Sequence, residues 1–289
     1  MDLQYKLLAL DLDGTLLTSD KRITKNTVKN INKARKRGLK VIIATGRDYS
    51  SAKLIAQKLQ LKLPIITNNG AYIVNSLNDE VIFEKRLNNR VLLEIIDILD
   101  RYELKYMIRN ESYSFGSYKP KMSMLFRFLN IQALRHLWLL RSSYKSMDDA
   151  EIKKHIKEKK IEPLKIFVHG KKVDTDNVEL ELVKTFKDEI GITTSGYGIE
   201  ILPKKISKAS GLEILTPILG VDKDEVMAIG DNFNDLEMIK YVGLGIAMGN
   251  APNEIQKHAK FVTETNDNDG VAFAIEKFVL KDPSLVENS

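Results

Sequence analysis

Two aspartates, Asp11 and Asp13, directly follow a short apolar run near the start of the chain, and Gly14 permits a turn after them. A carboxylate such as Asp11 could attack a phosphorus atom and form an aspartyl phosphate. Asp13, two residues later, could protonate the leaving oxygen and then deprotonate the attacking water. The pair is therefore a candidate nucleophile and acid/base for phosphoryl transfer.

Further polar segments follow later apolar runs; they are residues 45–47, 68–71 and 230–235. Asp231 would join Asp11 in supplying hard, anionic oxygens, the ligands that Mg²⁺ prefers. Thr45 offers a hydroxyl and nearby backbone N–H groups to phosphate oxygens. Lys208, at the start of a predicted helix, adds a positive charge and a favourable helix dipole. Together these residues predict a magnesium-assisted phosphoryl-transfer site.

The elements that must carry these residues alternate between strand-like and helix-like segments. Strands are predicted at residues 5–10, 39–44, 63–67, 225–229, 244–248 and 261–263, and helices at 24–37, 49–61, 207–219, 235–242, 253–258 and 271–279. This order predicts an α/β fold with a parallel sheet covered by helices. Because parallel strands end at one edge of such a sheet, the polar segments should meet in one crevice.

The middle of the chain has a different pattern and predicts a second, α+β domain inserted into the first. Helical periodicity after residue 90 gives way to short mixed runs and a clear strand at 164–169. The expected division is a catalytic core at 1–84 and 203–289 with an inserted cap at 85–202. Aromatic and basic residues mix within 122–140, as in nucleic-acid-binding segments, but core packing of the cap is the favoured interpretation.

Composition excludes several other classes of function. The chain has 289 residues, 43% hydrophobic and 29% charged, which is ordinary for a globular protein. It contains no cysteine, which excludes disulfide scaffolds, thiolate metal sites and thiol nucleophiles. The net charge of +6 suits anionic small substrates as well as nucleic acid. With no signal peptide or membrane-length apolar run, a soluble cytoplasmic location is expected.

The motifs and their order resemble those of the haloacid dehalogenase-like hydrolases, and more narrowly the Cof-type phosphatases of subclass IIB. The four motifs match residues 11–15, Thr45 within 44–47, Lys208 within 206–208, and residues 230–235. Segments 69–71, 247–251 and 269–271 match further features of the subclass. The resemblance covers both core segments and implies a Rossmann-like core, an α+β cap inserted between the second and third motifs, and Mg²⁺.

The resemblance also implies a role for each matched residue. The expected site comprises Asp11 and Asp13 as catalytic residues, Thr45, Gly46, Lys208 and Asn234 as phosphate-binding residues, Asp11, Asp13 (through its backbone carbonyl) and Asp231 as metal ligands, and Asp235, Arg47 and Asn69 as supporting residues. Lys205 and Ala209 stand where the family commonly has glycine. Neither departure removes a catalytic group, but both affect the turn into the helix that carries Lys208.

The leading interpretation is a phosphatase acting on a small phosphorylated metabolite such as a sugar phosphate, a nucleotide or a phosphorylated cofactor. A phosphomutase or phosphotransferase on the same fold stays open, as does a non-enzymatic phospho-aspartate switch or nucleic-acid-binding protein. A switch needs neither an acid/base at Asp13 nor a large cap, so turnover is favoured. We expect no nucleic-acid or membrane partner, and a monomer or weak homodimer.

Overall fold

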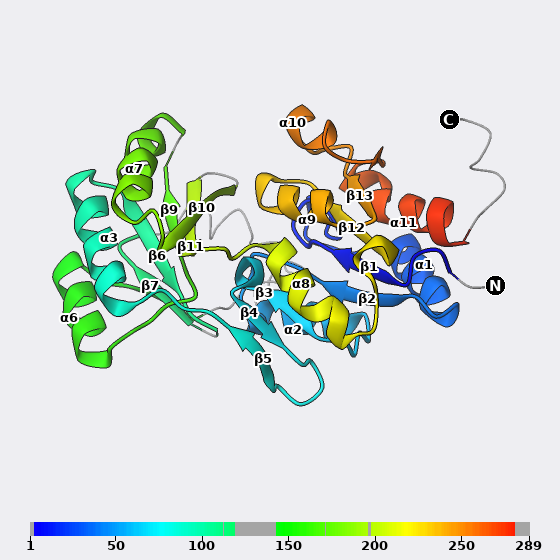
Figure 1. Ribbon diagram of the computed structural model, residues 1–289, viewed down its shortest axis with the longest axis horizontal. Coiled ribbons are helices and arrows are strands. Elements are labelled where there is room, and N and C mark those ends of the chain that lie inside the picture. The colour runs from blue at the N-terminus through cyan, green and yellow to red at the C-terminus, as the bar shows by residue number, and fades with distance from the viewer. Residues whose placement is uncertain (1–2, 112, 119–142, 171, 196–197, 281–289) are drawn as a thin grey trace.

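The computed structural model describes all residues except 1–2, 112, 119–142, 171, 196–197 and 281–289. Most of the mixed aromatic and basic segment, and the polar tail, therefore lie outside the described residues. Within the described part the strands form a five-stranded, a six-stranded and a three-stranded sheet. Figure 1 shows the five-stranded and six-stranded sheets in two separate parts of the molecule.

The five-stranded sheet is parallel throughout, as the sequence predicts. Its strand order is β14-β13-β12-β1-β2, and the strands are β1 (Leu7–Leu10), β2 (Lys40–Ile43), β12 (Val226–Gly230), β13 (Leu244–Ala247) and β14 (Phe261–Val262). Register pairs Leu10 with Ile229 on one side and with Ile43 on the other. The polar segments after these strands therefore start at the same edge of the sheet.

Alternate residues of these strands point to opposite faces, and helices cover both faces. On one face α1 (Lys25–Lys36), α2 (Tyr49–Lys58) and α11 (Gly270–Ile275) pack against Leu8, Leu10 and Ile229. On the other, α8 (Lys208–Ile218) and α9 (Leu236–Tyr241) pack against Leu7 and Ala9. A short α10 (Asn253–Gln256) and a π-helical turn, η6 (Glu276–Leu280), complete this part. The predicted doubly wound core is confirmed.

The third predicted strand differs from expectation. β3 (Ile65–Thr67) meets the parallel sheet through one bridge, between Ala44 and Ile66. Its main partner is antiparallel: β3 pairs with β4 (Tyr72–Val74), which pairs with β5 (Val81–Glu84). A tight turn at Asn68–Gly70 directs the chain back on itself, because Asn68 and Asn69 adopt left-handed backbone angles that asparagine tolerates. The expectation that β3 extends the parallel sheet as a regular strand is therefore wrong.

The inserted part of the chain forms the six-stranded sheet, in the order β10-β11-β9-β6-β7-β8. Its strands are β6 (Lys105–Arg109), β7 (Tyr113–Gly116), β8 (Ser143–Ser146), β9 (Lys165–His169), β10 (Ile190–Ser195) and β11 (Gly198–Pro203). Its helices α3 (Asn89–Arg101), α6 (Asp149–Lys159) and α7 (Lys172–Thr185) pack against one face, where the buried aliphatic residues lie. Figure 1 shows these helices on the side of the sheet away from the core. We call this part the cap; it confirms the predicted α+β insertion, and its exact limits stay a prediction.

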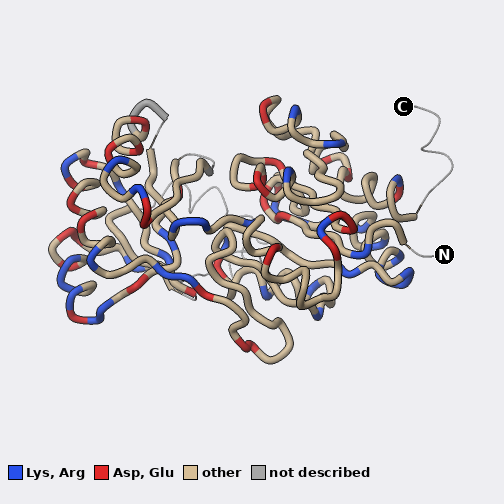
Figure 2. The backbone as a smooth tube through the Cα atoms, in the orientation of Figure 1, with Lys and Arg blue, Asp and Glu red and all other residues tan. Residues whose placement is uncertain are grey.

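Charged residues are spread over both parts of the molecule. Figure 2 shows lysine and arginine interspersed with aspartate and glutamate along the described chain, without one large region of a single sign. None of the described helices has the length and apolar character that crossing a bilayer requires. The net positive charge is thus not concentrated on one part of the described fold.

Candidate active site

The polar segments that follow β1, β2 and β12 meet in a crevice of about 300 Å³ between core and cap. Its core wall includes Asp11, Asp13, Thr45, Arg47 and Asn234. The predicted convergence of separate motifs is therefore what the fold produces. The cap contributes the facing wall through Arg109, Lys165, Phe167 and Glu200.

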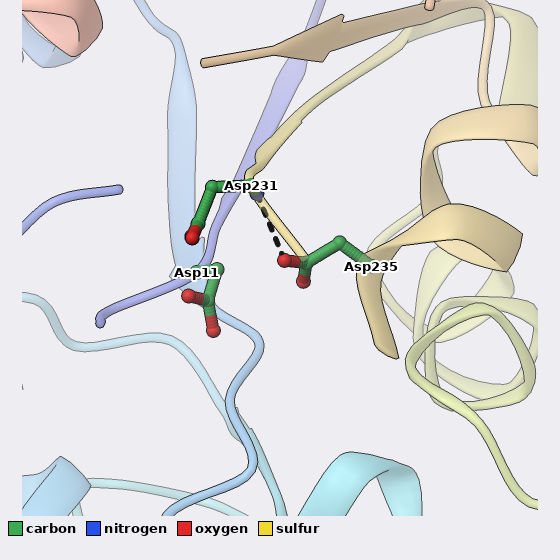
Figure 3. Close-up of side chains that lie close together, drawn as sticks. All are labelled: Asp11, Asp231 and Asp235. Carbon is green, nitrogen blue, oxygen red and sulfur yellow. Dashed lines mark hydrogen bonds between the residues drawn. The ribbon is translucent and has the colours of Figure 1, made fainter. Parts of the chain in front are cut away.

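Three carboxylates gather at the floor of this region. Asp11, Asp231 and Asp235 each offer an oxygen within 4.8 Å of the others, and they form the acidic cluster found among the described residues (Figure 3). Asp11 follows β1, and Asp231 follows β12. Gly14 lies against this cluster at φ +83°, where an added Cβ would come within 2.3 Å of an oxygen of Asp231. A side chain at position 14 would therefore collide with the cluster.

Lys208 joins the carboxylates from the first turn of α8. It is fully buried, and its Nζ donates to Oδ1 of Asp11 at 2.6 Å and to Oδ1 of Asp235 at 2.5 Å. Ser207 caps the helix by accepting the backbone N–H of Ser210, so Lys208 is the first residue of α8. Lys205 and Ala209, which stand where the family commonly has glycine, do not prevent this placement of Lys208. The ammonium group of Lys208 is thus hydrogen-bonded to two carboxylates, those of Asp11 and Asp235.

The cluster has the electrostatics of a cation site. Burial raises the pKa of Asp11 well above its usual range; Lys208 opposes this, while Asp235 and Asp231 add to it. Burial and then the charge of Asp235 raise the pKa of Asp231 to about 7. Crowded, buried carboxylates of this kind are stabilised in their ionised form by a divalent cation. The hard oxygen donors therefore fit Mg²⁺.

Asp235 has a supporting position within this cluster. Its Oδ2 accepts hydrogen bonds from the backbone N–H groups of Asp231 and Asn232, both at 3.0 Å, and its Oδ1 accepts from Lys208. Thr15 donates to Oδ1 of Asp231 at 2.8 Å. Oδ2 of Asp11, by contrast, has no hydrogen-bond donor within the described ranges. Asp235 therefore orients the loop that carries Asp231, while Asp11 keeps an oxygen available.

Asp13 is held by two cations at the mouth of the crevice. Arg47 donates from Nε to its Oδ2 at 2.6 Å and from a terminal nitrogen to its Oδ1 at 2.7 Å, and Lys21 donates to Oδ1 at 2.7 Å. Burial alone would raise the pKa of Asp13, but Arg47 and then Lys21 outweigh it and hold the pKa well below its usual range. Arg47 thus pairs with the predicted acid/base.

The remaining predicted residues lie around the same space. Thr45 is buried, and its Oγ1 accepts the backbone N–H of Arg47 at 3.1 Å. Asn234 donates to Oδ1 of Asn69 at 3.2 Å, and a Cβ at Gly46 would come within 2.9 Å of that oxygen. Every sequence-predicted site residue therefore lies at the crevice or contacts a residue that does.

Two cap residues tie the cap to this site. Lys165, on β9, is 1% exposed; its Nζ donates to the backbone oxygen of Gly46 at 2.7 Å and to the carboxylate of Glu200 on β11. Glu200 also accepts from the side-chain amide of Asn69. Burial lowers the pKa of Lys165, although the charge of Glu200 opposes this effect. Burial alone would raise the pKa of Glu200, but the charge of Lys165 outweighs it, and the pKa of Glu200 is lowered. An ionised, buried pair thus joins the cap to the core at Gly46 and Asn69.

Sequence reasoning did not identify this pair. A lysine opening the otherwise apolar strand at 164–169, and a glutamate between isoleucines at 199–201, were the available signals. Charged residues in apolar strands are seldom fully buried unless they are paired. Nothing in the sequence places the two strands side by side, however, so the partner of each charge could not be named.

We expect Lys165→Met to destabilise the protein by about 3 kcal/mol or more, because it leaves the Glu200 carboxylate buried without its cation. The thermal midpoint should fall, and the double variant Lys165→Met/Glu200→Gln should recover much of the loss. Lys154→Met, which removes an exposed lysine from α6, is the matched control. Equal midpoints for Lys165→Met and the control would show that the pair does not stabilise the fold.

Comparisons with known proteins agree with this geometry. The sequence model of the haloacid dehalogenase-like hydrolases matches residues 8–275. The chain is 33% identical over 273 residues to the stress response protein YhaX of Bacillus subtilis, covering 94% of this chain and 93% of that protein. It is 31% identical to the 5-amino-6-(5-phospho-D-ribitylamino)uracil phosphatase YcsE of the same organism, covering 96% of this chain and 98% of YcsE.

A solved structure shows the same architecture. A haloacid dehalogenase-like hydrolase from Bacteroides thetaiotaomicron superposes with a TM-score of 0.77 at 29% identity, covering 94% of this chain and 99% of that one. The inserted cap is therefore shared along with the core. With four motifs in one crevice and a family match over nearly its whole length, the chain belongs to the haloacid dehalogenase-like hydrolases and is a phosphatase of that family.

Proposed function

We propose that the protein is a Mg²⁺-dependent phosphatase that hydrolyses small phosphomonoesters through an aspartyl phosphate on Asp11. The observation that carries this proposal is the position of Asp11. Asp11 lines the crevice, and one of its oxygens has no hydrogen-bond donor among the described residues. Beside it lie a second carboxylate, Asp231, and a cation, Lys208. A bound Mg²⁺, held by Asp11 and Asp231, would supply the positive charge that lets a phosphate dianion approach a carboxylate.

The residues of the chain then divide the reaction between them. Oδ2 of Asp11 attacks phosphorus as the ester oxygen leaves, forming the aspartyl phosphate. Asp13 gives a proton to the leaving oxygen and takes one from the water that hydrolyses the intermediate. The Thr45 hydroxyl and the backbone N–H of Gly46, with Asn234, orient the phosphate oxygens. Lys208 keeps Asp11 and Asp235 in place and offsets their charge.

The size of the crevice supports a small metabolite as substrate. About 300 Å³ accommodates a compact phosphate ester rather than a polymer. YcsE is named as a phosphatase of 5-amino-6-(5-phospho-D-ribitylamino)uracil, which is a phosphorylated small molecule. A cap wall facing the carboxylates also favours turnover over a simple phospho-aspartate switch, because it encloses the part of a substrate beyond the phosphate.

Release of inorganic phosphate from a panel of phosphorylated metabolites tests the proposal. We expect turnover with Mg²⁺, loss of nearly all of it after chelation and gel filtration, and recovery when Mg²⁺ is returned. The reason is that without a cation the buried carboxylates repel the phosphate. Full activity in rigorously metal-free protein would contradict the proposal. Phosphate passed to an added alcohol in preference to water would instead indicate a phosphotransferase.

A further inference from the structure

The cap sheet has two chemically different faces, and the one turned towards the core carries charged residues. Register places Arg109 opposite Lys165, Met107 opposite Phe167, and Phe167 opposite Glu200. Residues paired in register share a face. The residues between them point to the helices and are buried aliphatic or aromatic side chains: Tyr106, Ile108, Ile166, Val168, Ile199 and Ile201. The polar face is thus an ordered surface that covers the crevice.

The charges on the walls of the crevice are paired with one exception. Arg47 is paired with Asp13, and Lys165 with Glu200. Arg109 makes no ion pair or hydrogen bond through its side chain with any residue in the described ranges, and its Nε is buried without a partner. Both carboxylate oxygens of Glu200 already accept a hydrogen bond, one from Lys165 and one from Asn69, and Arg109 acts on Glu200 only through its charge, which helps to lower the pKa of that carboxyl.

The longest stretch of the chain outside the described residues carries no carboxylate side chain. Residues 119–142 contain no aspartate or glutamate. Ser114, opposite Arg109 on β7, has a buried Oγ that also lacks a hydrogen-bond partner among the described residues. A buried guanidinium nitrogen and a neighbouring hydroxyl without partners therefore lie together on the polar face. Leaving such groups unsatisfied costs free energy that a bound acceptor would recover.

We propose that Arg109 binds a second anionic group on the leaving-group part of the substrate, so that the preferred substrates are phosphomonoesters carrying a carboxylate or a further phosphate. This rests on the proposed phosphatase function and specifies its substrate class. The guanidinium matches the planar, bidentate geometry of these anions. Asp11 and Arg109 border the same crevice from opposite walls, so a substrate bound at Asp11 presents its far end to the cap.

Matched esters test the proposal. 3-Phosphoglycerate and glycerol 3-phosphate share a carbon skeleton and differ in having a carboxylate or an alcohol at the far end. Fructose 1,6-bisphosphate and fructose 1-phosphate differ in having a second phosphate or an alcohol at C6, and so test the effect of a second phosphate. We expect the doubly anionic member of at least one pair to have the higher kcat/KM. Preference for neither, or for the uncharged heterocycle of 5-amino-6-(5-phospho-D-ribitylamino)uracil, would overturn the proposal.

Arg109→Met should lower kcat/KM for the doubly anionic ester by about 10- to 100-fold, mainly through KM, because a charge-assisted bidentate contact is lost. The matched ester with one phosphate should be unaffected, and Arg109→Lys should be intermediate. Lys105→Met is the control, since it removes a cation from the exposed start of the same strand and the same face. Equal losses on both esters would reject a role for Arg109 in binding the second anion.

Binding measured by calorimetry separates this inference from the proposed function. In the Asp11→Asn background with Mg²⁺, where no turnover is expected, the affinity for 3-phosphoglycerate should fall when Arg109→Met is added, while that for glycerol 3-phosphate stays constant. Hydrolysis without any such difference defeats the inference alone. Absence of hydrolysis with the affinity difference present defeats the proposed function alone.

Discussion

Asp11→Asn should abolish turnover while the protein stays folded. The substitution nearly preserves shape but removes both the nucleophile and one charge from the acidic cluster. Uncatalysed hydrolysis of phosphate monoesters is among the slowest reactions known, so a loss of at least about 10⁴-fold in kcat is expected. Phosphate release from the best ester of the panel, measured at saturating Mg²⁺, gives this number.

The structure adds an expectation about stability to the same variant. Because burial and neighbouring carboxylates raise the pKa of Asp11, its ionised form is unfavourable in the metal-free fold. Replacing it with a neutral amide should leave the thermal midpoint of the metal-free protein unchanged or higher, and Lys208 keeps Asp235 as a partner. Asp20→Asn, at an exposed position, is the control. Near-normal turnover by folded Asp11→Asn would reject the covalent mechanism.

The core and its site could be predicted because they depend on local signals in a fixed order. The segments that carry Asp11, Thr45 and Asp231 each follow a strand of four or five residues, and a parallel sheet brings such strand ends to one edge whatever the detail of the helices. Asp11, Thr45 and Asp231 therefore met as expected. The helix predicted at 207–219 likewise agrees with α8, which begins at Lys208 with Ser207 as its cap.

The third strand could not be predicted in the same way. Residues 63–67 have the composition of a buried parallel strand, and the preceding βα pattern favours that interpretation. What decides the pairing is the left-handed backbone at Asn68 and Asn69, which turns the chain into a hairpin. Asparagine is compatible with such a turn but does not require it. The pattern alone therefore left the parallel arrangement as the simpler choice.

The cap wall was beyond sequence reasoning for a different reason. Its function depends on which strands are neighbours: β6, β9 and β11 come from separate parts of the chain and contribute Arg109, Lys165 and Glu200 to one face. Alternation can show that each residue opposes the apolar face of its own strand. It cannot show that the polar faces of β6, β9 and β11 lie side by side, or that Arg109 has no carboxylate partner among the described residues.

Asp13→Ala should have the second large effect, and its size should depend on the leaving group. Removing an acid/base typically costs about 10²- to 10⁴-fold, and we expect such a loss for alkyl phosphates. Formation of the aspartyl phosphate from p-nitrophenyl phosphate should suffer much less, because nitrophenolate leaves without a proton. Hydrolysis of the intermediate should remain slow. A rapid release of one equivalent of nitrophenolate per enzyme, followed by slow turnover, is therefore the expected time course.

Asp13 pairs with Arg47 and Lys21, so its loss could slow the reaction in two ways: by removing proton transfer or by misplacing Arg47. Arg47 and Lys21 hold Asp13 as an anion, so it can accept a proton from water directly. To act as the acid it must first take up a proton, which requires this pairing to weaken. Asp13→Asn keeps the shape and can still accept a hydrogen bond from Arg47, yet it cannot take up a proton. If proton transfer is the role, Asp13→Asn should be as slow as Asp13→Ala on alkyl phosphates. Near-normal rates in Asp13→Asn, together with low rates in Asp13→Ala, would mean that Asp13 serves mainly to orient Arg47.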